Sequence, residues 1–275
     1  MNLIGIILAL GPALAPTIGG LMLPLFGWQS IFLLMTLIGF LVIWVALFSM
    51  KETVTADPSR LNFKALGRTY KSLLGNPQFM TAALVMGGAL GALYAQATFL
   101  PFILMDEVGL TPAQFGASML AQSGSFFAAS LLVRQLMGRF SANRLVGPGL
   151  VFVALGSLGT LTLLLWPPSF LHVMVPVATY SFGIAFVMPA MSTAALAPFG
   201  RSAGAAASML GFIQMGSGLL VGSIGAMMGN ALLAMAILIP MMGAMACISF
   251  LIYRKLQPPA SPTGPAATRA TCGPK

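Results

Sequence analysis

Residues 28–50 read WQSIFLLMTLIGFLVIWVALFSM, an apolar run that contains no charged side chain. At about 1.5 Å per residue, an α-helix of this length crosses the roughly 30 Å hydrocarbon core of a bilayer. The composition then changes abruptly, because the segment from Lys51 to Lys71 contains 5 basic side chains. This stretch therefore predicts a membrane-spanning helix that ends in a basic loop.

The composition of the whole chain supports the same interpretation. Of its 275 residues, 58% are hydrophobic and 6% are charged, whereas a soluble domain has about 25% charged residues. A water-soluble globular protein is therefore excluded, and the lipid bilayer is the expected partner. The net charge of +9 does not indicate nucleic acid as a partner, since the basic residues lie between apolar runs and do not form a patch with aromatic residues.

Further apolar runs of similar length lie on both sides of this stretch. They predict an all-α membrane protein with about eight transmembrane helices. The predicted spans are 3–23, 28–50, 78–100, 113–136, 147–166, 171–194, 203–227 and 229–253. Two of the starts are marked by a capping residue followed by proline, at Asn76-Pro77 and Thr111-Pro112.

The charged residues predict the orientation of these helices. In an eight-helix zigzag, all 13 Lys and Arg residues fall on one side, and the opposite connections contain Asp106, Glu107 and His172. Basic residues remain in cytoplasmic loops. We therefore expect a multi-pass protein of the cell inner (plasma) membrane with both termini in the cytoplasm.

The spans contain few groups that could carry out chemistry. No Asp, Glu, Lys or His lies in the middle of a predicted span, so the chain lacks a proton-carrying residue, a catalytic constellation and a metal-ligand set there. His172 has neither a carboxylate nor a second histidine beside it in the sequence and is interpreted as an interfacial polar residue. The sequence therefore predicts no enzyme, no metal and no cofactor.

Polar side chains within the spans are candidates for a solvated substrate pathway, because a polar group in a membrane should face protein or a wet cavity. The candidate cavity residues are Tyr94, Gln96, Gln122, Tyr180 and Gln214. The alternative for each of them is a hydrogen bond between helices.

The first predicted helix contains a recognisable pattern of small residues. Glycines and prolines at Gly11, Pro12, Pro16, Gly19 and Gly20 run into Gly27–Phe32. This pattern resembles the antiporter motif on the fifth helix of drug exporters of the major facilitator superfamily, and it is most similar to the Bcr/CflA subfamily. Ala15 stands where many members have glycine.

Two further stretches are similar to the same superfamily. Gly138, Arg139 and Arg144 lie in a segment that resembles a degenerate cytoplasmic loop motif, and 204–208 resembles the start of the eleventh helix. The resemblance implies helices 5–12 of a twelve-helix fold, with the first four missing. Residues 1–50 would be the last two helices of the N-terminal half, and residues 51–77 would be a cytoplasmic central loop with an amphipathic helix. Residues 78–255 would form the C-terminal six-helix half, and residues 256–275 a disordered cytoplasmic tail.

The function that the resemblance implies is multidrug or metabolite efflux by proton-coupled antiport in the full-length parent. The transported substrates would be small amphipathic or cationic compounds, and the proton-coupling acidic residue would belong to the missing helices. We therefore expect the truncated chain alone not to raise dye efflux. The alternative is a membrane bundle that does not transport or that needs a partner.

Overall fold

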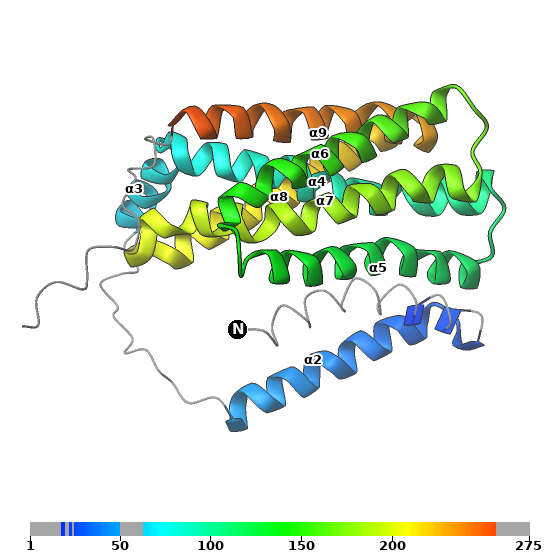
Figure 1. Ribbon diagram of the computed structural model, residues 1–275. Coiled ribbons are helices and arrows are strands. Elements are labelled where there is room, and N and C mark those ends of the chain that lie inside the picture. Colours follow the sequence, from blue (N-terminus) through cyan, green and yellow to red (C-terminus); the bar gives the residue numbers. More distant parts are fainter. Residues whose placement is uncertain (1–17, 20–21, 24, 50–62, 257–275) are drawn as a thin grey trace, which may run out of the picture.

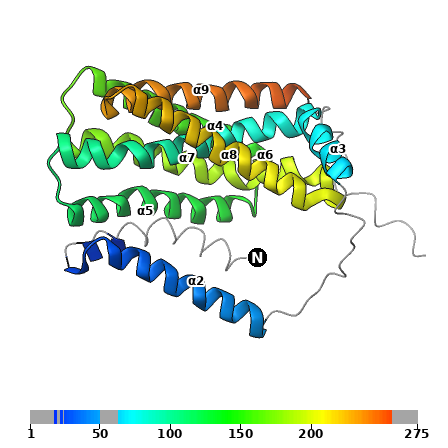
Figure 2. The ribbon, with the colours of Figure 1, turned by 180° about the vertical axis from the view of Figure 1, so that it is seen from behind.

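The computed structural model describes residues 18–19, 22–23, 25–49 and 63–256, and every regular element within these ranges is helical. Figures 1 and 2 show the helices from two opposite sides. The elements are α2 (Gln29–Ser49), α3 (Phe63–Leu74), α4 (Pro77–Pro101), the π-helix η2 (Phe102–Glu107), α5 (Pro112–Leu136), α6 (Ala142–Leu161), η3 (Thr162–Leu164), α7 (Phe170–Leu196), η4 (Ala197–Ser202), α8 (Ala203–Met227) and α9 (Ala231–Leu256).

The predicted membrane spans are confirmed wherever the structure describes them. Within the described ranges, 7 helices are long and apolar enough to cross a bilayer: α2, α4 with η2, α5, α6 with η3, α7 with η4, α8 and α9. The remaining predicted span, 3–23, lies largely outside the described residues. The chain is a multi-pass, all-helical membrane protein.

Some predicted boundaries differ from those of the structure. The span predicted at 147–166 begins at Ala142, because Ser141 has the extended backbone of an N-cap and the polar residues Asn143 and Arg144 form the first turn. The span predicted at 78–100 continues as a π-helix to Glu107. Hydropathy predicts where a helix enters hydrocarbon, whereas the backbone can continue as a helix into the polar interface.

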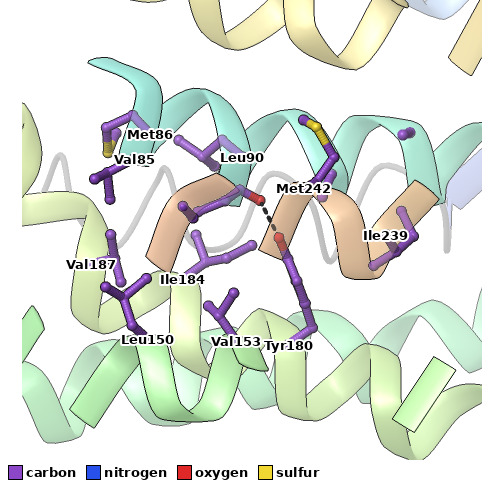
Figure 3. Close-up of a cluster of buried hydrophobic side chains, with 14 of the residues drawn as sticks. Val85, Met86, Leu90, Leu150, Val153, Tyr180, Ile184, Val187, Ile239 and Met242 are labelled. Carbon is purple, nitrogen blue, oxygen red and sulfur yellow. Dashed lines mark hydrogen bonds between the residues drawn. The ribbon is translucent and has the colours of Figure 1, made fainter. Parts of the chain in front are cut away.

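Helices α4 and α7 form the centre of the bundle. Helix α4 packs against α7, α8 and α9, and α7 packs against α4, α5 and α6, while α6 and α9 also contact each other. The buried core lies between α4, α6, α7 and α9. Figure 3 shows part of it, with Val85, Met86, Leu90, Leu150, Val153, Tyr180, Ile184, Val187, Ile239 and Met242 labelled.

Small residues allow α6 and α7 to approach closely. An added Cβ at Gly156 would lie 2.6 Å from the backbone nitrogen of Tyr180, and one at Gly149 would lie 3.0 Å from the carbonyl oxygen of Gly183. At Gly183, an added Cβ would lie 2.5 Å from the carbonyl oxygen of Gly149. The backbones of the two helices are thus in direct contact, as is typical of helix pairs that associate inside a bilayer.

The amphipathic helix predicted within 51–77 is present as α3, at the end of the bundle where α4 and α8 begin (Figure 1). Leu73 anchors it, since this side chain is fully buried. Helix α2 differs from the others because it contributes no buried residue. Its apolar side chains are therefore left uncovered by the described part of the chain.

Candidate substrate pathway

Helices α4 and α8 cross at glycines. The hydroxyl of Ser217 on α8 donates a hydrogen bond of 2.9 Å to the carbonyl oxygen of Gly87 on α4. An added Cβ at Gly218 would lie 2.8 Å from Cβ of Tyr94 and 3.1 Å from the carbonyl oxygen of Gly91. Gly87/Gly91 on α4 and Gly218/Gly222 on α8 have the four-residue spacing that is typical of close helix contacts in membranes, and they lie on facing sides of one crossing. We call this crossing, with the hollow beside it, the α4–α8 seam.

The seam widens into an open hollow beyond this crossing. A pocket of about 330 Å³ is lined by residues of both helices, namely Tyr94, Thr98, Gly218, Leu219, Gly222, Ser223 and Ala226. Gly218 lets the two helices touch, and Gly222 has no side chain that would fill the pocket beside Thr98. Tyr94 is 41% exposed and is the aromatic residue of this pocket.

A second pocket continues from the first towards the connection between α4 and α5. Its volume is about 390 Å³, and it shares Thr98 and Ala226 with the first pocket. Its wall contains exposed Phe102 and the carboxylates of Asp106 and Glu107. These two are the acidic residues of the described part of the chain. The seam therefore changes from aromatic near the middle of α4 to acidic at the end of η2.

Tyr180 makes a polar contact between the central helices. Its side chain is fully buried, and its hydroxyl donates to the carbonyl oxygens of Gly88 at 3.1 Å and Ala89 at 3.2 Å (Figure 3). This is the interhelical hydrogen bond that the sequence leaves open as an alternative to lining a pathway. It ties α7 to the middle of α4.

Replacing Tyr180 by phenylalanine is expected to lower the free energy of unfolding by about 1 kcal/mol, since hydrogen bonds between membrane helices contribute on this order. Thermal unfolding of the purified protein in detergent measures the change. Tyr94→Phe is the matched control, because it removes the hydroxyl of an exposed tyrosine and should leave the Tm unchanged. Equal Tm values for both variants and the original chain would contradict a stabilising role for the Tyr180 hydroxyl.

Gln96 lies on the other side of α4 from Tyr94, because two residues correspond to about 200° of helix rotation. Its side chain is fully buried, and neither polar atom of its amide has a hydrogen-bond partner among the described residues. Leaving a buried polar group unpaired costs about 1–3 kcal/mol. Packing alone therefore does not account for an amide at this position.

The other two predicted glutamines are half-buried on different helices. Gln214 lies on α8 one turn before Gly218, and hence on the same side of that helix. Gln122 lies on α5, which packs against α7. Of the five predicted cavity residues, Tyr94 lines the first seam pocket. Gln214 lies one helical turn from that pocket and lines neither pocket, and Gln96 and Tyr180 are buried inside the bundle. A cavity shared by all five stays a prediction.

The two predicted motifs are described to different extents. Gly11, Pro12, Pro16 and Gly20 of the antiporter motif lie outside the described residues, and an added Cβ at Gly19 would meet nothing within 4 Å among the described ones. The loop-motif residues Gly138, Arg139 and Arg144 are all exposed. Gly138 and Arg139 form the turn after α5, and Arg144 lies in the first turn of α6.

His172 has a structural partner. Its Nε2 lies 2.7 Å from the hydroxyl of Thr162, so it links the start of α7 to η3. Across the described residues, no group of three His, Cys, Asp or Glu side chains could hold a metal ion.

The sequence interpretation missed the outer part of the seam. It treats Asp106 and Glu107 simply as charges of the connection between two helices, but both line a pocket because the helix continues through Pro101 to Glu107. Ser217, which directly precedes Gly218 and hydrogen-bonds to the Gly87 carbonyl, was also missed.

Comparison with known proteins places these helices in a family. The sequence model of the Major Facilitator Superfamily matches residues 1–226. The chain belongs to the Major Facilitator Superfamily. The superfamily named by the sequence resemblance is thus confirmed, and the family is one of transporters.

Curated relatives include several multidrug transporters. The chain is 27% identical over 228 residues to the uncharacterized MFS-type transporter YdgK of Bacillus subtilis, covering 81% of this chain and 55% of the relative. It is 28% identical to the multidrug transporter MdfA of Edwardsiella ictaluri, covering 75% and 50%, respectively. For the multidrug resistance protein MdtM of Salmonella typhimurium, the identity is 25%, with 70% and 46% covered. The chain spans about half the length of these relatives.

A solved structure supports the fold. The fucose:proton symporter FucP of E. coli matches with a TM-score of 0.57 and 16% identity, covering 83% of this chain and 55% of FucP. At this identity the likeness concerns the fold alone.

Proposed function

We propose that these helices form part of an efflux transporter that exports amphipathic or cationic compounds by proton-coupled antiport, as in the Bcr/CflA-like subfamily. The observation that carries this proposal is the α4–α8 seam. It offers an aromatic side chain, Tyr94, near the middle of a central helix and two carboxylates, Asp106 and Glu107, at its outer end.

The chemistry of the seam suits such substrates. An organic cation is attracted to the face of an aromatic ring and to carboxylates, while apolar walls accept its hydrophobic part. The absence of a side chain at Gly222 leaves the pocket beside the crossing open. The similarity to MdfA and MdtM favours drugs as the substrates.

The proton-coupling residue belongs, in this proposal, to helices that the described part of the chain does not supply. Asp106 and Glu107 lie at the end of η2, not within the middle of a span, and their position suits contact with cations at the mouth of the path. The charge asymmetry of the loops favours a cytoplasmic position for α3 and the C-terminal end of α9.

The test is ethidium efflux in a bacterial strain that lacks its own drug pumps. The gene is expressed with any coding sequence that precedes Met1, and efflux is followed by fluorescence with and without a proton uncoupler. Faster efflux that the uncoupler abolishes supports the proposal. No efflux from cells in which the protein is present in the membrane would contradict it.

Replacing Tyr94 by alanine is expected to lower efflux at limiting ethidium by roughly 2- to 30-fold, since a cation over an aromatic ring gains about 0.5–2 kcal/mol. Tyr94→Phe keeps the ring and serves as the control, with efflux close to that of the unchanged protein. Equal efflux from Tyr94→Ala would mean that the substrate does not pass along this seam.

One observation favours the alternative function, a bundle that needs a partner. Helix α2 has no buried residue, so the described part of the chain leaves its apolar surface free to contact another helix. If the expressed chain is inert alone but efflux appears when a second polypeptide is co-expressed, this alternative holds.

A further inference from the structure

Helix α3 has two chemically different faces. Lys64, Arg68 and Lys71 follow the spacing i, i+4 and i+7, so they share one arc of the helix. Arg68 and Lys71 are exposed to solvent. Leu73 lies on another side and is fully buried, while Leu66 and Leu74 are 43% and 51% exposed. A basic arc with exposed leucines on the other sides of the helix is typical of a helix that lies at a membrane surface.

The place of α3 in the fold puts this basic arc at the level of the membrane surface. Helix α3 contacts α4 and α8, which begin at this end of the bundle, and Figure 1 shows it at an angle to the spanning helices. Helix α9 ends at the same side with Arg254 and Lys255, both exposed. Because α4, α8 and α9 span the bilayer, their ends mark the headgroup region.

The charge at this end is positive. The acidic residues of the described ranges, Asp106 and Glu107, lie at the opposite end of α4. In the sequence, the segment from Lys51 to Lys71 contains 5 basic residues and two acidic ones, Glu52 and Asp57. A partner that complements this surface must therefore be anionic, and the exposed Leu66 and Leu74 require that it also accept apolar groups.

We infer that the basic arc of α3, together with Arg254 and Lys255, binds the headgroups of anionic phospholipids such as phosphatidylglycerol. Phospholipids meet both demands, since the phosphate accepts hydrogen bonds from Arg and Lys and the acyl chains receive the leucines. Clusters of basic residues on an amphipathic helix beside a span bind anionic lipids in this way. This binding is independent of whether the protein transports drugs.

The test measures lipid binding to the full purified chain. Phosphatidylglycerol and phosphatidylcholine are titrated separately in detergent, and bound lipid is counted by native mass spectrometry. The unchanged protein should bind phosphatidylglycerol more tightly. Each charge removed from α3 should weaken this binding about fivefold, because one basic residue near an anionic surface contributes on the order of that factor. Lys64→Gln/Arg68→Gln/Lys71→Gln should abolish the preference.

The matched control removes three charges from the other basic connection at the same end, as Arg134→Gln/Arg139→Gln/Arg144→Gln. These residues lie on α5, on α6 and in the turn between them, away from α3 in the chain, and this variant should retain the preference for phosphatidylglycerol. Circular dichroism and gel filtration check that both triple variants are folded. The single variant Arg68→Gln changes one exposed residue and is a milder substitution for the same test.

Three outcomes would overturn the inference. The first is equal binding of the two lipids to the unchanged chain. The second is equal loss in both triple variants, which would indicate attraction by net charge alone. The third outcome compares two competitors that are added at the same total negative charge, an acidic peptide and glycerol phosphate. If the peptide displaces bound phosphatidylglycerol and glycerol phosphate does not, the surface would be assigned to a protein partner.

Discussion

Replacing Gly156 by alanine is expected to destabilise the bundle by about 1–3 kcal/mol, the usual cost of adding a methyl group to a filled core. The nearest atoms to the added Cβ would be the backbone nitrogen of Tyr180 at 2.6 Å, the carbonyl oxygen of Pro176 at 2.8 Å and Cα of Tyr180 at 2.8 Å. All three are backbone atoms, so no side chain can rotate away and α6 must separate from α7. Thermal unfolding in detergent, followed by tryptophan fluorescence, measures the loss as a lower Tm.

Gly124→Ala is the control for this substitution. Gly124 also lies in a spanning helix, α5, but an added Cβ there meets nothing within 4 Å among the described residues. Alanine favours a helix over glycine by roughly 0.5–1 kcal/mol, so the Tm should stay equal or rise slightly. A Tm of Gly156→Ala equal to that of the control would show that α6 and α7 are not in backbone contact.

Much of the fold follows from the sequence because membrane spans are long and apolar. The span predicted at 203–227 coincides with α8. The span predicted at 113–136 differs from α5 by one residue at its start, and the span predicted at 28–50 differs from α2 by one residue at each end. The start of α6 could not be predicted in this way. Its first turn is polar, and the N-cap at Ser141 depends on backbone geometry that hydropathy does not report.

Helix contacts were only partly predictable. The four-residue spacing of Gly87/Gly91 and of Gly218/Gly222 is typical of close helix packing, and these pairs face each other in the structure. Gly225/Gly229 has the same spacing, yet Gly229 lies in the turn after α8 with a φ of +67°, and an added Cβ there meets nothing within 4 Å among the described residues. Spacing predicts a smooth face of a helix but does not identify the helix that covers it.

The candidate site illustrates the same limit. Tyr94 and Gln96 are both polar residues of one predicted span, and from the sequence both are candidates for the substrate cavity. The structure places them on opposite sides of α4, with Tyr94 in the seam and Gln96 in the core. Hydropathy does not show which helices surround α4, so it cannot decide which side of α4 is open.

Replacing Gly222 by leucine is expected to block the seam while preserving the bundle. An added Cβ at this position meets the side chain of Thr98 at 3.5 Å, an ordinary contact distance, so the helices need not move apart. The rest of the leucine side chain must then occupy the pocket of about 330 Å³. Steric overlap with this side chain should weaken the binding free energy of a substrate in the pocket by about 1–3 kcal/mol. This loss corresponds to roughly 5- to 150-fold weaker binding.

Gly216→Leu is the matched control because it makes the same change on the same helix. Gly216 lies on another side of α8, where an added Cβ has no neighbour within 4 Å in the described structure. Ethidium efflux should fall in Gly222→Leu and remain in Gly216→Leu, while the Tm values of both variants stay close to that of the unchanged protein. Unchanged efflux in a folded Gly222→Leu variant would exclude the α4–α8 seam as the substrate path, and a fall in both variants would indicate that α8 acts through its packing instead.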